Sequence, residues 1–226
     1  LLGRPESGPG LSSALTPWFF SRPQSKTQCS AEIAVYEFGA DAGGAGEKAF
    51  DAWTQAVLKG LEAENGERVI EPGFEYECNY DAQMVVTYAS PELIAAMIPY
   101  YVYGGGAHGN SNVLAVAIDL AAGETLAFSD VFKAGAAPGL IEACTADLLR
   151  EKIERFTDVS DPGSAGSVEA QARDDLKTYG EAISEAIGNF ERWQIYADRA
   201  EVYFSPYTLG SYAEGDYVCT LPKALL

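Results

Sequence analysis

The residues most suited to catalysis or ligand binding lie in one stretch. There, three consecutive glycines, 104–106, precede His108, the one histidine of the chain. Glycine tolerates positive φ and lets another backbone or a ligand approach closely. Apolar runs flank the stretch on both sides, at 93–103 and 113–120. We therefore predict a special corner between two strands, not a plain hairpin. The imidazole of His108 is the first side chain to consider for catalysis or metal binding.

The sequence does not supply the partners that either chemistry needs. Nucleophilic hydrolysis requires a Ser or Cys near the imidazole and a carboxylate that orients it. The chain has no Gly-x-Ser-x-Gly and no His-Glu-x-x-His motif. Paired carboxylates for glycoside hydrolysis stay open, but nothing selects one pair. We expect no catalytic residue, no metal and no cofactor, and a His108 that fixes the corner by hydrogen bonds to backbone or to Asp119.

A ligand-binding role stays open for this corner and for aromatic residues near the end of the chain. Tyrosine rings stack on sugars and anchor protein partners, although they serve equally well as cross-strand packing pairs. The candidate ligand-binding residues are Tyr103, Gly104, Gly105, Gly106, His108, Gly109, Asn110, Tyr207 and Tyr212.

The four cysteines, Cys29, Cys78, Cys144 and Cys219, are dispersed along the chain with no Cys-x-x-Cys pair. An even, dispersed set indicates two disulfides in an oxidising compartment. Of the three possible pairings, Cys29–Cys78 with Cys144–Cys219 is favoured, because each bond would tie an element near a chain end to a distant one. The alternative is four buried free thiols in a cytosolic protein.

The charge is strongly negative, with 15 basic residues against 33 acidic ones and a net charge of −18. This argues against nucleic acid as a partner, because phosphate binding requires basic patches. A negative field would steer cationic partners to the surface, although an acidic surface that only keeps the protein soluble is the alternative. No apolar run reaches the roughly 18–20 residues that span a bilayer, so we expect a soluble chain without a transmembrane segment.

Periodicity predicts the elements that position these residues. Apolar residues at helical spacing predict three helices, at 47–64, 139–156 and 168–190. Strand patterns predict about seven or eight mostly antiparallel strands, among them 28–38, 67–80 with 84–89 as its hairpin partner, 93–103 and 113–120. We therefore predict an α+β fold with a mixed, mostly antiparallel sheet or sheets and about three helices.

Residues 1–25 differ from the rest because Gly, Pro and Ser are frequent there. We predict an N-terminal tether or linker over 1–25, in which the aromatic residues 18–20 could anchor onto the protein. A single domain is predicted over 26–226.

Two blocks of sequence resemble a known family. The first is Tyr103-Gly-Gly-Gly-Ala-His-Gly109, followed by a strand ending in Asp119-Leu120, then Gly123 and residues 129–132. The second consists of residues 202–207, 212–215 and 218–222. In type and order these parts resemble the extracytoplasmic domain shared by the lysozyme-binding anti-sigma factor RsiV and the non-catalytic part of the peptidoglycan deacetylase PdaC. The resemblance extends from about Cys29 to the end of the chain.

The resemblance implies a non-catalytic binding domain at the cell envelope. It implies lysozyme, or another cationic protein, as a partner that the domain binds or inhibits. A peptidoglycan-binding or other glycan-binding accessory role is the alternative, and an envelope enzyme of unknown chemistry is a weaker one. We expect export to the periplasm or the cell exterior, with lipid anchoring through a removed N-terminal segment as a further option.

Overall fold

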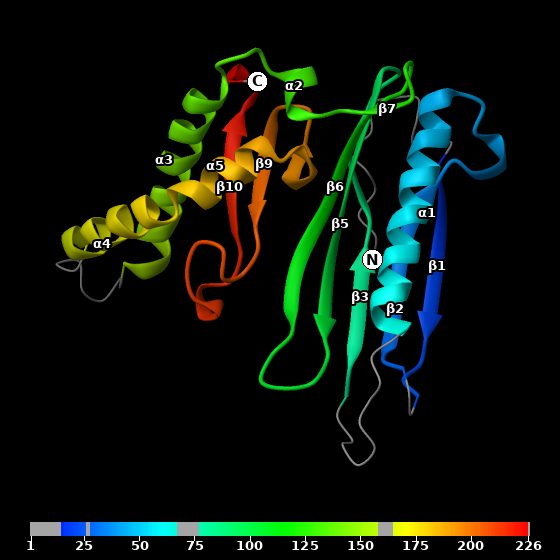
Figure 1. Cartoon of the computed structure of the whole chain (residues 1–226), viewed down its shortest axis with the longest axis horizontal. Helices are drawn as coiled ribbons and strands as arrows, with labels where there is room; N and C mark the ends of the chain where they lie inside the picture. Colours follow the sequence, from blue (N-terminus) through cyan, green and yellow to red (C-terminus); the bar gives the residue numbers. More distant parts are fainter. Residues whose placement is uncertain (1–14, 26–27, 67–76, 158–164, 226) are drawn as a thin grey trace. The chain divides into compact units, whose positions relative to one another are not determined.

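Figure 1 shows the computed structural model of the chain, which describes residues 15–25, 28–66, 77–157 and 165–225. The chain divides into two compact units, Leu1–Leu126 and Ala127–Leu226. Both combine helices with mostly antiparallel strands, so the predicted α+β class is confirmed. The single domain expected over 26–226 remains a prediction, since compact units and domains need not coincide. None of the described helices has the length and apolar character required to cross a bilayer.

The first unit is a seven-stranded sheet with one long helix and a short 3-10 turn. Its elements are β1 (Thr16–Arg22), β2 (Ser30–Glu37), η1 (Gly39–Asp41), α1 (Ala45–Gly66), β3 (Asn79–Gln83), β4 (Val85–Ala89), β5 (Leu93–Tyr103), β6 (Asn110–Asp119) and β7 (Glu124–Thr125).

The strand order is β1-β2-β3-β5-β6-β7, and β4 pairs with β5. Only β2 and β3 run parallel, which requires a crossover connection, and α1 lies in that connection. The predicted hairpin between 67–80 and 84–89 is wrong. The pairs Ala82–Tyr100 and Val85–Met97 keep one register, so β3 and β4 form a continuous run along β5. The part of the predicted strand at 67–76 lies outside the described residues.

The core of this unit lies between α1 and one face of the sheet, and Figure 1 shows the helix running along the strands. Phe50, Leu58 and Leu61 recur at helical spacing and are buried. They pack against alternate strand residues, such as Ile33 and Ile98, because successive strand side chains point to opposite faces. Each such buried side chain contributes about 1.5–3 kcal/mol relative to exposure.

The structure corrects the C-terminal limit of the predicted tether. Residues Thr16–Arg22 form β1 and pair along their whole length with β2. Phe20 packs against the core, and the Trp18 ring stacks on the Phe20 ring with centroids 6.2 Å apart. These aromatic residues offset the Pro and Ser content that suggested irregular structure. Residues 1–14 lie outside the described part of the chain.

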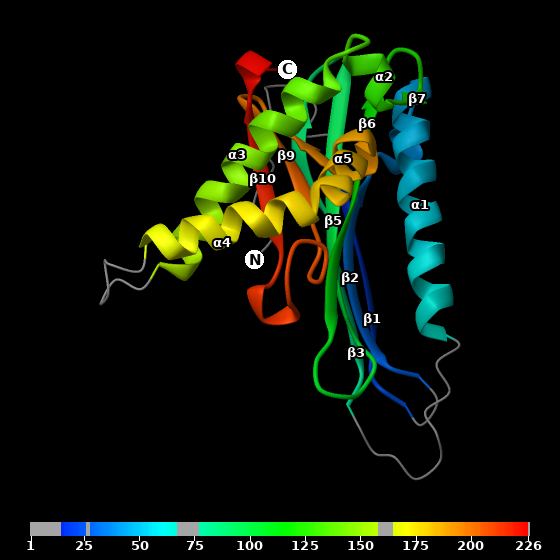
Figure 2. The same ribbon diagram turned by 60° about the vertical axis from the view of Figure 1, so that its left-hand side comes forward.

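The second unit places helices against a three-stranded antiparallel sheet of order β10-β9-β8. Figure 2 shows α3 and α4 side by side, with α5 following α4. Its elements are α2 (Phe128–Val131), α3 (Ala137–Phe156), α4 (Ala165–Thr178), α5 (Gly180–Gly188), η3 (Phe190–Arg192), β8 (Trp193–Ile195), β9 (Arg199–Phe204), η4 (Tyr212–Glu214), β10 (Tyr217–Pro222) and η5 (Lys223–Leu225).

The helix predicted over 168–190 is two helices. The α-helical run is interrupted at Tyr179, where φ is −92° and ψ is 10°, away from helical values. Gly180 follows, and glycine weakens a helix interior by about 1 kcal/mol relative to alanine. Together with the short α2, this break raises the helices of the described chain from the predicted three to five, four of them of seven residues or more.

A cluster of aromatic rings fills the core of the second unit around Trp193. Its ring lies 5.2 Å from that of Phe132 and 5.5 Å from that of Phe190, centroid to centroid. Its Nε1–H donates to Ile187 O at 3.1 Å, which satisfies the one polar group of a side chain only 1% exposed.

Each unit contains one disulfide. Cys29 bonds Cys78 in the first unit, with the Cα atoms 4.8 Å apart. Cys144 bonds Cys219 in the second, with the Cα atoms 5.3 Å apart. Of the three possible pairings, this is the one favoured from the sequence.

Candidate functional site

The glycine corner is the connection at 104–109 between the antiparallel strands β5 and β6. It is therefore a β-hairpin with a long loop. Gly105 and Gly106 have φ of 90° and 101°, values that other residues rarely adopt. The Tyr103 hydroxyl donates to Gly106 O at 2.9 Å and closes the loop from its own strand. Backbone conformation thus explains Gly105 and Gly106, but not Gly104.

Gly109 is needed for a different reason, which is close packing. A Cβ at this position would collide with the Tyr101 ring and with the backbone oxygen of Val102. The neighbouring His108 has its Nδ1 atom 3.0 Å from Gly109 O, so that the ring N–H donates to the backbone. Of the two partners expected for His108, backbone and Asp119, this hydrogen bond is to backbone.

The other expected partner of His108 performs a different task. Asp119 lies at the far end of β6, where its Oδ1 accepts from Ala121 N and Ala122 N, each at 2.8 Å. It fixes the turn that leads to β7. Among the described residues, no three or more His, Cys, Asp or Glu side chains are grouped so that they could hold a metal ion.

The predicted site residues fall into two groups. Tyr103 to Asn110 belong to the first unit, whereas Tyr207 and Tyr212 belong to the second. Within the second unit the two tyrosine rings lie together, with centroids 5.5 Å apart. The ligand-binding role of either group stays a prediction.

Tyr207 has an unusual backbone. It is the one described residue other than glycine with positive φ, at 71°. It follows Pro206 in a turn closed by Thr208 N donating to Ser205 O at 3.0 Å. In a type II turn this third position normally belongs to Gly or Asn, and a larger residue there costs about 1–2 kcal/mol. The Tyr207 side chain is nevertheless 58% exposed, so burial of the ring does not offset this cost.

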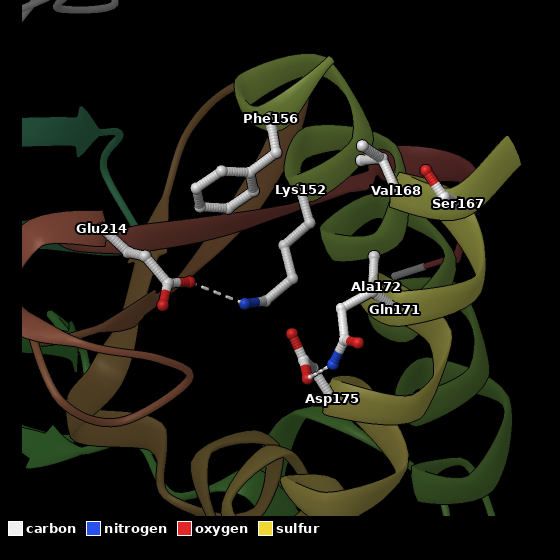
Figure 3. Close-up of a pocket in the computed structure, with 8 residues that line it drawn as sticks. All are labelled: Lys152, Phe156, Ser167, Val168, Gln171, Ala172, Asp175 and Glu214. Atoms are coloured by element: carbon white, nitrogen blue, oxygen red, sulfur yellow. Dashed lines mark hydrogen bonds and ion pairs between the residues drawn. The ribbon is translucent and has the colours of Figure 1, made fainter. Parts of the chain in front are cut away.

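The structure adds a pocket that the sequence analysis missed. Figure 3 shows it in the second unit, between α3, α4 and the turn η4. Its volume is about 420 Å³, within the usual range of ligand pockets. Apolar walls come from Phe156, Val168 and Ala172, and polar groups from Lys152, Asp175 and Glu214.

The ammonium of Lys152 and the carboxylate of Glu214 form an ion pair at the edge of this pocket. Lys152 Nζ donates to Glu214 Oε2 at 2.8 Å, and the lysine side chain is only 1% exposed. The ammonium also lies 4.8 Å from the centroid of the Tyr217 ring. A buried charge of this kind is costly unless it is paired and hydrogen-bonded, and Glu214 meets that need.

Glu214 is held by three donors. Burial alone would raise the pKa of its carboxyl, but hydrogen bonds from Lys152, Ser211 N and Tyr217 outweigh burial and lower the pKa to about 2. The Tyr217 hydroxyl donates to Oε2 at 2.8 Å and Ser211 N to Oε1 at 2.8 Å. Burial, and then the hydrogen bond to Glu214, raise the pKa of the Tyr217 hydroxyl well above its usual range.

Arg155 also holds the segment 214–217 in place. Its guanidinium lies 4.3 Å from the Tyr217 ring centroid. Its Nη1 donates to Glu214 O at 2.7 Å and its Nη2 to Asp216 O at 2.8 Å. It also pairs with Glu151. The turn η4 is therefore tied to α3 by both its side chain and its backbone.

The sequence contains weak signals for this site. Ser211-x-x-Glu214 has the pattern of a capping box, and the structure forms it. Lys152 follows Cys144 and Leu148 at four-residue spacing, which places it on the buried face of α3. Neither signal identifies the other residue as a partner across 62 positions.

Comparisons with known proteins give one family match, which lies within the second unit. Residues 129–224 match the model of a family described as a protein of unknown function, DUF3298. A comparison with curated proteins gives no match.

Two solved structures share the fold over nearly the whole chain. A DUF3298 family protein from Pseudomonas aeruginosa is 15% identical with a TM-score of 0.60, and the match covers 96% of this chain and 94% of that one. A family member from Bacteroides fragilis is 17% identical with a TM-score of 0.58, over 94% and 92% of the two chains. Residues 129–224 are therefore similar to the DUF3298 family, whose function is unknown, and the chain shares the fold of two solved proteins of that family.

Proposed function

We propose that this protein is a non-catalytic binding domain of the cell envelope whose partner is a cationic protein, lysozyme being the first to test. The observation that supports binding is Tyr207, a large aromatic residue held at a φ of 71° and 58% exposed. Strained backbone of this kind persists where the surrounding structure imposes it and is concentrated at functional sites. Tyrosine is also enriched among the residues that dominate protein interfaces.

The charge supports a cationic partner. The chain has a net charge of −18, and a strongly basic protein would be steered toward it. The sequence blocks that resemble the extracytoplasmic domain of RsiV and PdaC favour lysozyme among such proteins. Electrostatic association is screened over about 10 Å at 0.1 M salt, so the interaction should weaken as salt is raised.

The test is a calorimetric titration of the full chain into chicken-type lysozyme at low and moderate salt, with lytic activity followed in parallel. We expect sub-micromolar binding that weakens with salt, and an inhibitor would also suppress lysis. Tyr207→Gly should weaken binding at least tenfold. Phe19→Ala, which removes an equally exposed ring from the first unit, should leave binding unchanged. Absence of heat at both salt concentrations would exclude this class of lysozyme.

The pair Tyr207 and Tyr212 also supports a second candidate, binding of peptidoglycan glycan. Two adjacent rings with centroids 5.5 Å apart form an aromatic surface of the kind that stacks on sugars. Affinity for glycan fragments would depend on both rings and would be nearly independent of salt. Titration with soluble peptidoglycan fragments in place of lysozyme separates the two candidates.

We also propose that the protein works outside the cytosol. Two disulfides, Cys29–Cys78 and Cys144–Cys219, support this location, because such bonds persist in oxidising compartments. The test is alkylation of protein from the envelope fraction, before and after reduction. Before reduction, none of the four cysteines should be labelled. Labelling without reduction would count against export.

A further inference from the structure

The pocket between α3, α4 and η4 has an unbalanced charge. Of its three ionic groups, the ammonium of Lys152 is neutralised by Glu214, which it contacts at 2.8 Å. The remaining group, Asp175, has one side-chain hydrogen bond within the described residues, which it accepts from the neutral amide of Gln171 at 2.8 Å. No ion pair joins Asp175 to any cation in the described part of the chain. One negative charge therefore faces the pocket without compensation.

The walls beside this carboxylate suit a hydrocarbon stem and a delocalised cation. Val168 and Ala172 come from the same face of α4 as Asp175, at helical spacing, and Figure 3 shows all of them around the pocket. Phe156 contributes a ring that is 48% exposed. An aromatic face attracts a cation, more often a guanidinium than an ammonium.

An anionic ligand does not fit this arrangement. Among the described residues that line the pocket, the buried ammonium of Lys152 is the one positive group, and Glu214 already compensates it. A carboxylate or phosphate entering the pocket would face both Glu214 and Asp175. Repulsion between these like charges would oppose its binding.

We propose that this pocket binds the side chain of an arginine, and less tightly that of a lysine, from a cationic partner protein. The guanidinium lies against Asp175, where its fork geometry matches the carboxylate, and its methylene stem lies on Val168 and Phe156. This assignment rests on the proposed function and gives the chemistry by which a basic protein is recognised. The turn η4 serves both sites, because Tyr212 belongs to the aromatic pair with Tyr207 and Glu214 to the pocket.

The pocket can be tested without any partner protein. The full chain, labelled with ¹⁵N, is titrated with Nα-acetyl-arginine methylamide and followed by amide chemical shifts. The matching lysine and norleucine derivatives are titrated in parallel. We expect saturable shifts confined to amides of α3, α4 and η4, with a millimolar Kd for arginine, about fivefold weaker binding for lysine and none for norleucine. Equal binding of norleucine, or tighter binding of acetate than of arginine, would overturn the proposal.

Substitutions decide whether Asp175 is responsible. Asp175→Asn should weaken binding of the arginine derivative at least tenfold. Asp174→Asn makes the same change of charge on the same helix, at an exposed residue that does not line the pocket, and should leave binding unchanged. Equal losses in the two variants would show that only the overall charge matters, which would refute the site.

The lysozyme titration separates failure of this proposal from failure of the proposed function. Binding of the arginine derivative without binding of lysozyme would refute lysozyme as the partner and leave the pocket standing. Equal lysozyme affinity for the wild-type chain and for Asp175→Asn, with no binding of the arginine derivative, would refute the pocket and leave the partner standing.

Discussion

Glu214→Gln preserves the shape of a side chain and removes the charge that compensates Lys152. The pKa of the Glu214 carboxyl is lowered from 4.5 to about 2 in the folded protein. At about 1.4 kcal/mol per pKa unit, the carboxylate contributes at most about 3.4 kcal/mol to stability. The side chain is 18% exposed, and solvent screening lowers this figure. We therefore expect a loss of about 2 kcal/mol in the free energy of unfolding at pH 7.

The same change predicts a pH dependence. Because the pKa is lower in the folded than in the unfolded protein, the contribution is complete above pH 4.5 and disappears as the pH falls toward 2. The stability difference between wild type and Glu214→Gln should therefore be constant from pH 7 to about pH 5. It should then shrink steadily between pH 4.5 and pH 2.5.

The assay is urea denaturation at a series of pH values, monitored by Trp193 fluorescence. Trp18→Phe and Trp53→Phe in every protein leave Trp193 as the one tryptophan, and it lies in the second unit. Asp174→Asn is the charge-matched control and should stay within about 0.5 kcal/mol of wild type. A stability loss for Glu214→Gln that is the same at pH 7 and pH 3 would refute the argument, because the lost interactions would then not depend on the ionised carboxylate.

Three further outcomes follow from the geometry, each measured as the free energy of unfolding in urea. Gly109→Ala should destabilise the protein by about 1–3 kcal/mol through overpacking, whereas Gly60→Ala, in α1 with nothing within 4 Å of the new Cβ, should stabilise it by about 0.5–1 kcal/mol. Equal effects would show that close packing does not explain Gly109. Tyr207→Gly should leave stability within about 1 kcal/mol of wild type, since relief of a φ of 71° offsets the entropy of glycine, and a larger loss would show that the ring is structural. Replacing Cys144 and Cys219 by Ser should cost about 4 kcal/mol, from the 75-residue separation that the disulfide closes, and a cost below about 1 kcal/mol would refute this entropic estimate.

Much of the fold could be predicted because helix periodicity is a local signal. Helices expected at 47–64 and 139–156 are found at Ala45–Gly66 and Ala137–Phe156. The break at Tyr179 was missed because the apolar face continues through it, with Leu176 and Ile183 both buried. Strand pairing was harder. Alternation at 84–89 identifies a strand but not its partner, and β4 pairs with β5 in the register that β3 begins.

The candidate site was predictable only where one short segment determines it. The loop at 104–109 is recognisable from its glycines, and its contacts lie largely within the hairpin. The pocket depends on Lys152 and Glu214, which are 62 positions apart, and a single sequence does not reveal such a pair. The positive φ of Tyr207 could not be predicted from the sequence either, because a tyrosine at that turn position normally indicates a negative φ.

Each disulfide closes within one unit, Cys29–Cys78 before residue 126 and Cys144–Cys219 after it. The peptide bond between Leu126 and Ala127 is therefore the one covalent link between the two units. Cleavage there would leave two fragments with no covalent bond between them, each with its own disulfide.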